Sequence, residues 1–156
     1  MPDGTVAIIL GASEWPKFNR LPSSGAFKNS AAEFEEYLLN PKGLNLGREN
    51  ILWLFDDSSS VADLDEKIEE FLLASADRFD NEIANLFVYY TGHGAYTEGD
   101  QKYCLVMRAS RDGALGQSAY RVASLARTIN SKAPKARRFI IIDACFAGAA
   151  LGDFIV

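Results

Sequence analysis

Residues 84–94 read ANLFVYYTGHG, and residues 138–148 read RFIIIDACFAG. Each stretch begins with an almost wholly apolar run, the pattern of a strand buried on both faces of a parallel sheet. Each run then passes into a short segment that contains glycine. These two segments hold the only histidine of the chain, His93, and one of its two cysteines, Cys145. Binding sites gather at the carboxyl ends of parallel strands, so we expect both side chains at that edge of the sheet.

Further apolar runs over residues 5–10 and 51–55 predict two more strands of the same kind. Apolar residues at three- and four-residue spacing predict helices over 26–39, 61–76 and 120–130. Strands that alternate with helices usually pair in parallel through right-handed crossovers. The sequence therefore predicts an α/β fold, a three-layer α/β/α sandwich with a mostly parallel central sheet.

The composition limits the classes of function. The chain has 156 residues, 48% hydrophobic and 24% charged, which suits one globular domain over residues 1–156. A net charge of −5 argues against nucleic acid and against an anionic membrane surface as partners. Two cysteines and one histidine are too few for a zinc cluster, and neither a metal nor another cofactor is implied. Residues 1–5 lack the features of a signal peptide, and no apolar run is long enough to span a membrane. We expect a cytoplasmic protein with reduced thiols.

The pairing of a histidine with a cysteine indicates a specific chemistry. A thiol becomes an effective nucleophile when a neighbouring imidazole takes its proton. If the strands at 84–91 and 138–143 are neighbours, about 4.8 Å apart, His93 and Cys145 can converge. The N–H groups of Gly94 and Cys145 are then candidates for an oxyanion hole, which would stabilise a tetrahedral intermediate.

The segments VYYTGHG (88–94) and IIIDACFAG (140–148) resemble those of the caspase-like cysteine peptidases, which include caspases, metacaspases and many bacterial relatives. His93 precedes Cys145 by about 50 residues, the separation typical of caspases. The resemblance runs from about residue 6 to residue 152 and implies a caspase-like fold. It implies that His93 is the general base and acid, that Cys145 is the nucleophile, and that Gly94 and Cys145 hold the oxyanion.

The resemblance also implies a substrate class. In this family the residue two positions before the nucleophile lines the S1 pocket, and Asp143 stands there. A carboxylate pairs with a cationic P1 side chain, which implies cleavage after Arg or Lys, with Thr91 at the pocket wall. A cap for the following turn is the alternative role of Asp143. Metacaspases often have Asp after the Asn at the start of the first helix, as a second acidic residue of the S1 pocket. This chain has Asn29-Ser30 there and lacks that carboxylate.

The motif DACFAG lacks the His-Ser that follows the metacaspase cysteine and the Gln of animal caspases, so it is closest to bacterial caspase-like domains. Many of those serve in defence or programmed death. Caspase-like domains add two strands beyond this point, so the resemblance implies a large-subunit part whose sheet is completed by a small-subunit segment or chain. The strand at 138–143 is then expected in the interior of the sheet, because an edge there would expose unpaired amides. The other partners implied are a peptide or protein substrate and an upstream activator.

Two other functions remain open. One is a catalytically silent interaction or signalling module with the same fold. The other is a domain that binds phosphate or nucleotide at the strand ends, although the glycine after the first strand lacks the spacing of a dinucleotide motif.

Two further features have structural interpretations. Cys104 lies in a strand-like segment at 103–107, which could form half of a small hairpin, and is expected to pack in the interior. Asp56 and Asp57 follow the second strand. They could bind a cation, since calcium activates some metacaspase-like enzymes, but a solvated turn is the expected role.

Overall fold

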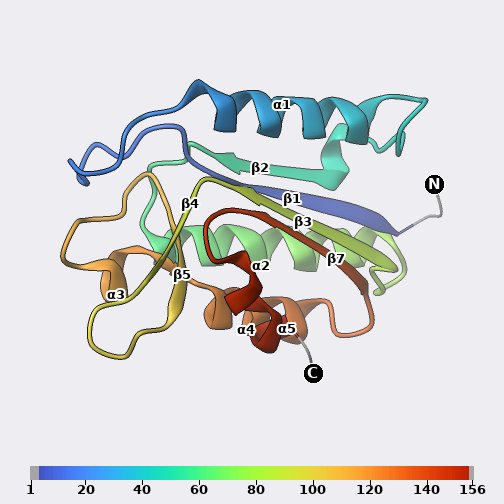
Figure 1. The fold of residues 1–156 in the computed structure, drawn as a ribbon. Helices are drawn as coiled ribbons and strands as arrows, with labels where there is room; N and C mark the ends of the chain where they lie inside the picture. Colours follow the sequence, from blue (N-terminus) through green and yellow to red (C-terminus); the bar gives the residue numbers. More distant parts are fainter. Residues whose placement is uncertain (1–3, 155–156) are drawn as a thin grey trace.

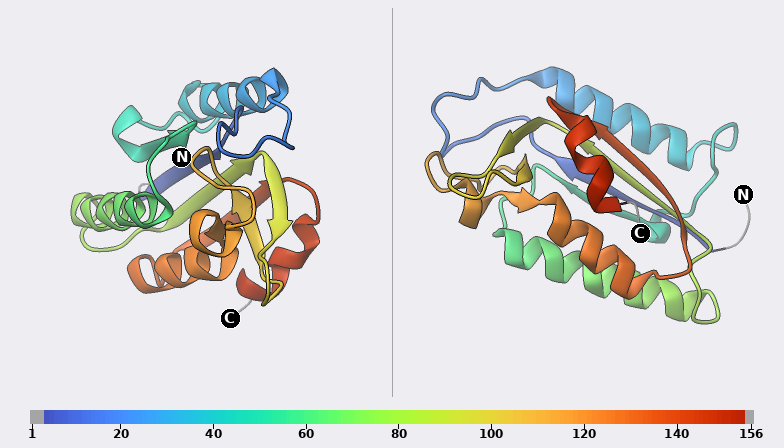
Figure 2. Two further views of the ribbon diagram at one scale, coloured as in Figure 1. Left: turned by 90° about the vertical axis from the view of Figure 1, so that its left-hand side faces the viewer. Right: turned by 60° about the horizontal axis from the view of Figure 1, so that its bottom comes forward.

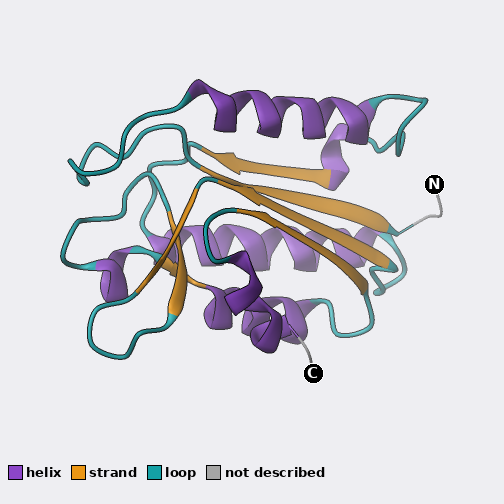
Figure 3. Ribbon diagram, in the orientation of Figure 1, coloured by secondary structure: helices purple, strands orange, loops and turns teal. Residues whose placement is uncertain are grey.

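The computed structural model describes residues 4–154 and has a central sheet of four parallel strands (Figures 1 and 3). In spatial order these are β2 (Ile51–Phe55), β1 (Thr5–Gly11), β3 (Asn85–Thr91) and β7 (Arg137–Asp143). All four strands expected from the apolar runs are confirmed, with bounds that differ by at most one residue. Residues 1–3, which entered the signal-peptide prediction, lie outside the described residues.

Helices lie on both faces of this sheet. Helix α1 (Gly25–Leu39) covers one face, and α2 (Val61–Arg78) and α4 (Val122–Lys132) cover the other (Figures 1 and 2). The shorter helical elements are η1 (Arg48–Asn50), α3 (Leu115–Ser118), η2 (Ala147–Ala150) and α5 (Leu151–Phe154). The Ser60 hydroxyl accepts a hydrogen bond from the Asp63 N–H and so caps α2. Within residues 4–154, no helix combines the length and the apolar character that are needed to cross a bilayer.

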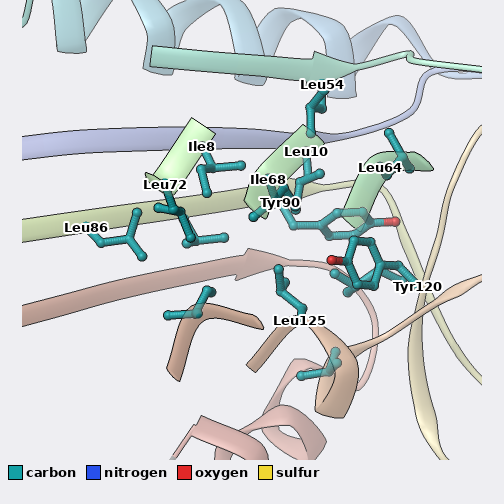
Figure 4. Packing of buried hydrophobic residues seen from close by; sticks show 14 of the residues in the cluster. Ile8, Leu10, Leu54, Leu64, Ile68, Leu72, Leu86, Tyr90, Tyr120 and Leu125 are labelled. Carbon is teal, nitrogen blue, oxygen red and sulfur yellow. The ribbon is translucent and has the colours of Figure 1, made fainter. Parts of the chain in front are cut away.

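Two apolar layers hold the helices to the sheet. Leu64, Ile68 and Leu72, at four-residue spacing on α2, pack against Ile8 and Leu10 of β1, and all five are fully buried (Figure 4). On the opposite face, α1 packs on the intervening residues of β1. Because successive side chains of a strand point to opposite faces, a strand covered on both sides must be apolar throughout. This explains the uninterrupted apolar run that predicted β1.

A second, smaller sheet stands beside the carboxyl ends of the parallel strands. It contains β4 (His93–Tyr96), β5 (Tyr103–Val106) and β6 (Tyr120–Arg121), all antiparallel. The hairpin half expected at 103–107 is confirmed, and its partner is the segment that begins at His93. Cys104 is fully buried in this sheet, as expected. Helix α4 starts two residues later than predicted because Tyr120 and Arg121 pair with β5 instead.

Strand β7 does not have the interior position that was expected for it. Within residues 4–154 it pairs with β3 on one side, and no described strand pairs with its other side. Its Phe139 stacks on Phe87 of β3, with ring centroids 4.5 Å apart, but Phe139 and Ile141 remain 38% and 41% exposed. Among the described residues β7 is therefore an edge strand, and the completing strand that would make it interior stays a prediction.

Candidate active site

The candidate site lies where β3 and β7 end. The two strands pair in parallel, and their last residues, Thr91 and Asp143, are aligned. The Gly92 N–H donates a hydrogen bond of 3.3 Å to the carbonyl of Asp143, which continues the contact beyond the strands. His93 and Cys145 each stand two residues after the aligned pair. The expectation that the two strands are neighbours is therefore confirmed.

Gly94 lies directly against the main chain of Cys145. A Cβ atom on Gly94 would lie 2.5 Å from the carbonyl oxygen of Cys145 and 2.2 Å from the hydroxyl oxygen of Tyr103. Both separations are far below van der Waals contact, so only glycine fits without a shift of the chain. The two residues whose N–H groups were candidates for the oxyanion hole therefore adjoin. Cys145 is exposed, so a substrate can reach it.

The His93 ring is half-buried against two aromatic side chains. Its centroid lies 4.4 Å from the ring of Trp15 and 5.4 Å from that of Phe27. Burial lowers the pKa of His93 from its usual value, and a hydrogen bond to the backbone of Pro22 acts in the opposite direction. The imidazole is therefore neutral at pH 7 and able to accept a proton.

One nitrogen of the His93 ring has no partner in the described chain. Nε2 is one of two buried side-chain atoms in residues 4–154 that have no hydrogen-bond partner. In the tautomer that carries its hydrogen on Nδ1, the lone pair of Nε2 is available to take a proton. Neither Trp15 nor Pro22 was identified from the sequence, because the loop that carries them has no periodic pattern.

Asp143 and Thr91, the two candidate S1 residues, are in contact. The Thr91 hydroxyl donates to a carboxylate oxygen of Asp143 at 3.3 Å, with Thr91 fully buried and Asp143 exposed. The hydroxyls of Thr91 and of Ser30 on α1 act to lower the pKa of Tyr89, against a larger opposite effect of burial. Burial raises the pKa of Tyr89, and the carboxylates of Asp143 and Glu33 add to this rise.

Two buried tyrosines bind the main chain of the candidate catalytic residues. The Tyr90 hydroxyl lies 2.6 Å from the His93 carbonyl oxygen, and the Tyr103 hydroxyl lies 2.8 Å from the Cys145 carbonyl oxygen. Tyr90 is fully buried in the sheet. A Cβ atom on Gly92 would lie 2.7 Å from the Tyr90 hydroxyl. The two glycines that flank His93 in the sequence each leave room for a tyrosine hydroxyl: Gly92 for that of Tyr90 and Gly94 for that of Tyr103.

The acidic pair after β2 has protein partners. The N–H and the hydroxyl of Ser13 donate to the Asp56 carboxylate at 2.7 and 2.6 Å. Lys67 donates to Asp57 at 2.8 Å. Asp56 has a φ of 58°, which Asp tolerates in turns. These contacts support the turn interpretation, and residues 4–154 contain no group of three side chains that could hold a metal ion.

A scan against models of protein families and a search of the curated proteins both found no match to this chain. A function for this chain is therefore inferred from the chemistry of the candidate site. An exposed thiol, an imidazole with a free lone pair, two adjoining backbone segments and a carboxylate meet at one edge of the sheet. That combination suits acyl transfer to a thiol.

Proposed function

We propose that this chain is the catalytic part of a caspase-like cysteine endopeptidase that cleaves peptide bonds after Arg or Lys. The observation that carries the proposal is the meeting of the segments that bear His93 and Cys145, with Gly94 against the Cys145 main chain. The resemblance of residues 88–94 and 140–148 to the family motifs adds to it.

The reaction uses groups of this chain alone. Nε2 of His93 takes the proton of the Cys145 thiol, and the thiolate attacks the carbonyl carbon of the scissile bond. The N–H groups of Gly94 and Cys145 stabilise the resulting oxyanion. When the intermediate collapses, the C–N bond breaks and the His93 imidazolium gives its proton to the leaving amine. Water then hydrolyses the thioester, which releases the acid and restores the thiol.

The preference for Arg or Lys rests on charge. The exposed carboxylate of Asp143 is available to pair with a cationic P1 side chain, while Thr91 holds its other side. A carboxylate in this position favours a cationic P1 residue and disfavours an acidic one.

A strand that completes the sheet at β7 is part of the same proposal. Among residues 4–154, no strand pairs with the outer side of β7, and its Phe139 and Ile141 are partly exposed. On the other face, Ile140 and Ile142 line a cavity of about 280 Å³ together with residues of η2 and α5. Unpaired edges with apolar flanks recruit further strands, which suits a small-subunit segment or chain. Both cysteines are free thiols, which suits the cytoplasm.

Hydrolysis of fluorogenic peptides with Arg, Lys or Asp at P1 tests the proposal. We expect cleavage after Arg and Lys, loss of cleavage in Cys145→Ala and His93→Gln, and full retention in Cys104→Ala, because Cys104 is fully buried. Activity that persists in Cys145→Ala contradicts the proposal. The exposed apolar side chains of β7 favour an interaction module as the second candidate. The interaction module gains support if a thiol-reactive peptidyl inhibitor does not label Cys145 and none of the peptides is cleaved.

A further inference from the structure

Tyr103 connects the two halves of the candidate site. It lies on β5, the strand that pairs with β4 and hence with the segment that starts at His93. Its hydroxyl passes the space left by Gly94 and donates to the carbonyl of Cys145 at 2.8 Å. A single side chain therefore links the small antiparallel sheet to the loop that follows β7.

The loop after β7 has a conformation that needs such support. Phe146, the residue after Cys145, has a φ of 58°, in the left-handed region. For a residue with a side chain this conformation costs about 1–2 kcal/mol, so contacts from elsewhere must hold it. The Phe146 side chain is 66% exposed, so its own burial contributes little to holding this conformation.

The small sheet contacts this loop at two points. Besides the hydrogen bond from Tyr103, the ring of Tyr96 lies 5.7 Å from that of Phe146. Tyr96 also packs edge-to-face on Tyr103, with ring centroids 5.7 Å apart. Tyr103 is only 5% exposed, and burial raises its pKa to about 12. Its hydroxyl therefore stays protonated and acts as a donor across the neutral pH range.

We propose that Tyr103 is a positioning residue of the reaction, because its hydroxyl holds the Cys145 carbonyl beside Gly94 and so fixes the main chain that carries the Cys145 thiol and N–H. This inference rests on the proposed peptidase function. An oxyanion is stabilised only by donors placed within about 2.7–3.1 Å of it. A small shift of the Cys145 loop therefore lowers the rate of the chemical step. Substrate affinity depends instead on the S1 carboxylate of Asp143 and changes little.

Tyr103→Phe in the full chain tests the proposal, because it removes one oxygen and keeps the ring. Tyr37→Phe is the matched control, since Tyr37 lies on α1 and is 50% exposed. The reactive Cys145 sites are first counted by titration with a thiol-reactive peptidyl inhibitor, so that kcat is expressed per reactive site. We expect kcat per titrated site to fall about tenfold, which corresponds to about 1.4 kcal/mol, with KM within twofold of wild type. Amide hydrogen exchange of residues 144–148 is expected to become faster in the same variant.

The titration separates positioning from a merely structural role of Tyr103. If the role is merely structural, the substitution lowers the number of reactive sites and leaves kcat per site unchanged. The proposal requires both changes, so a wild-type kcat per site or a wild-type exchange rate overturns it. A raised KM at constant kcat assigns Tyr103 to substrate binding and also overturns it. If wild type cleaves no peptide, the proposed function fails, and hydrogen exchange alone then decides whether Tyr103 holds the loop.

Discussion

Gly94→Ala is expected to disrupt the contact on which the candidate site depends. The new Cβ atom would lie 2.2 Å from the Tyr103 hydroxyl oxygen and 2.5 Å from the Cys145 carbonyl oxygen. Nonbonded heavy atoms prefer about 3.5–4.0 Å, so both groups must move by roughly 1 Å or more. Overpacking costs about 1–3 kcal/mol, and loss of the Tyr103–Cys145 hydrogen bond costs about 1 kcal/mol more. We therefore expect the free energy of unfolding to fall by about 2–4 kcal/mol, measured by urea denaturation.

Two comparisons isolate the cause of that loss. Gly25→Ala is the matched control, because Gly25 opens α1 and a Cβ atom there meets nothing within 4 Å. It is expected to leave stability unchanged or to raise it by up to about 1 kcal/mol. In a Tyr103→Phe background the clash with the hydroxyl disappears, so Gly94→Ala is expected to cost at least about 1 kcal/mol less there. The contacts of the Cβ atom with the Cys145 carbonyl oxygen and, at 2.9 Å, with Cζ of the residue 103 ring persist, so some cost remains. An equal cost in both backgrounds would refute the reasoning.

Three further predictions concern the site. Burial lowers the pKa of His93, so the unfolded chain binds a proton at a higher pH than the folded chain does. The free energy of unfolding should therefore fall as the pH drops through about 6.5 and level off below the lowered pKa. Urea denaturation at several pH values should show this fall in wild type relative to His93→Gln, and parallel profiles would contradict it. Asp143→Asn should lower kcat/KM for Arg substrates by about 10–100-fold, since a charged hydrogen bond is worth about 1.5–3 kcal/mol, while an equal loss for neutral P1 residues would exclude an S1 role. Iodoacetamide at pH 8 should alkylate Cys145 and spare Cys104, which is fully buried and has its pKa raised to about 11, as mass spectrometry of the modified peptides will determine.

Local pattern was sufficient for most of the elements that carry the site. The apolar runs at 84–91 and 138–143 predicted β3 and β7 to within one residue, because a strand covered on both faces must be apolar along its length. The same runs placed His93 and Cys145 at one edge of the sheet, since parallel strands end on the same side. The segment that contains His93 was not predicted to be a strand, however, and His93 begins a strand that pairs with β5. A four-residue strand with two small residues has too little side-chain pattern to be recognised.

The sequence by itself thus determined the strands, their common direction, and the presence of one histidine and one cysteine where they end. Only the tertiary structure decided the contacts that make a site of them. These are the edge position of β7 and the hydrogen bonds of Tyr90 and Tyr103 to the main chain of His93 and Cys145. Each depends on how elements that are separate in the chain pack together. A periodic pattern reports how one segment is buried, and it carries no record of which distant hydroxyl or carbonyl fills the space beside a glycine.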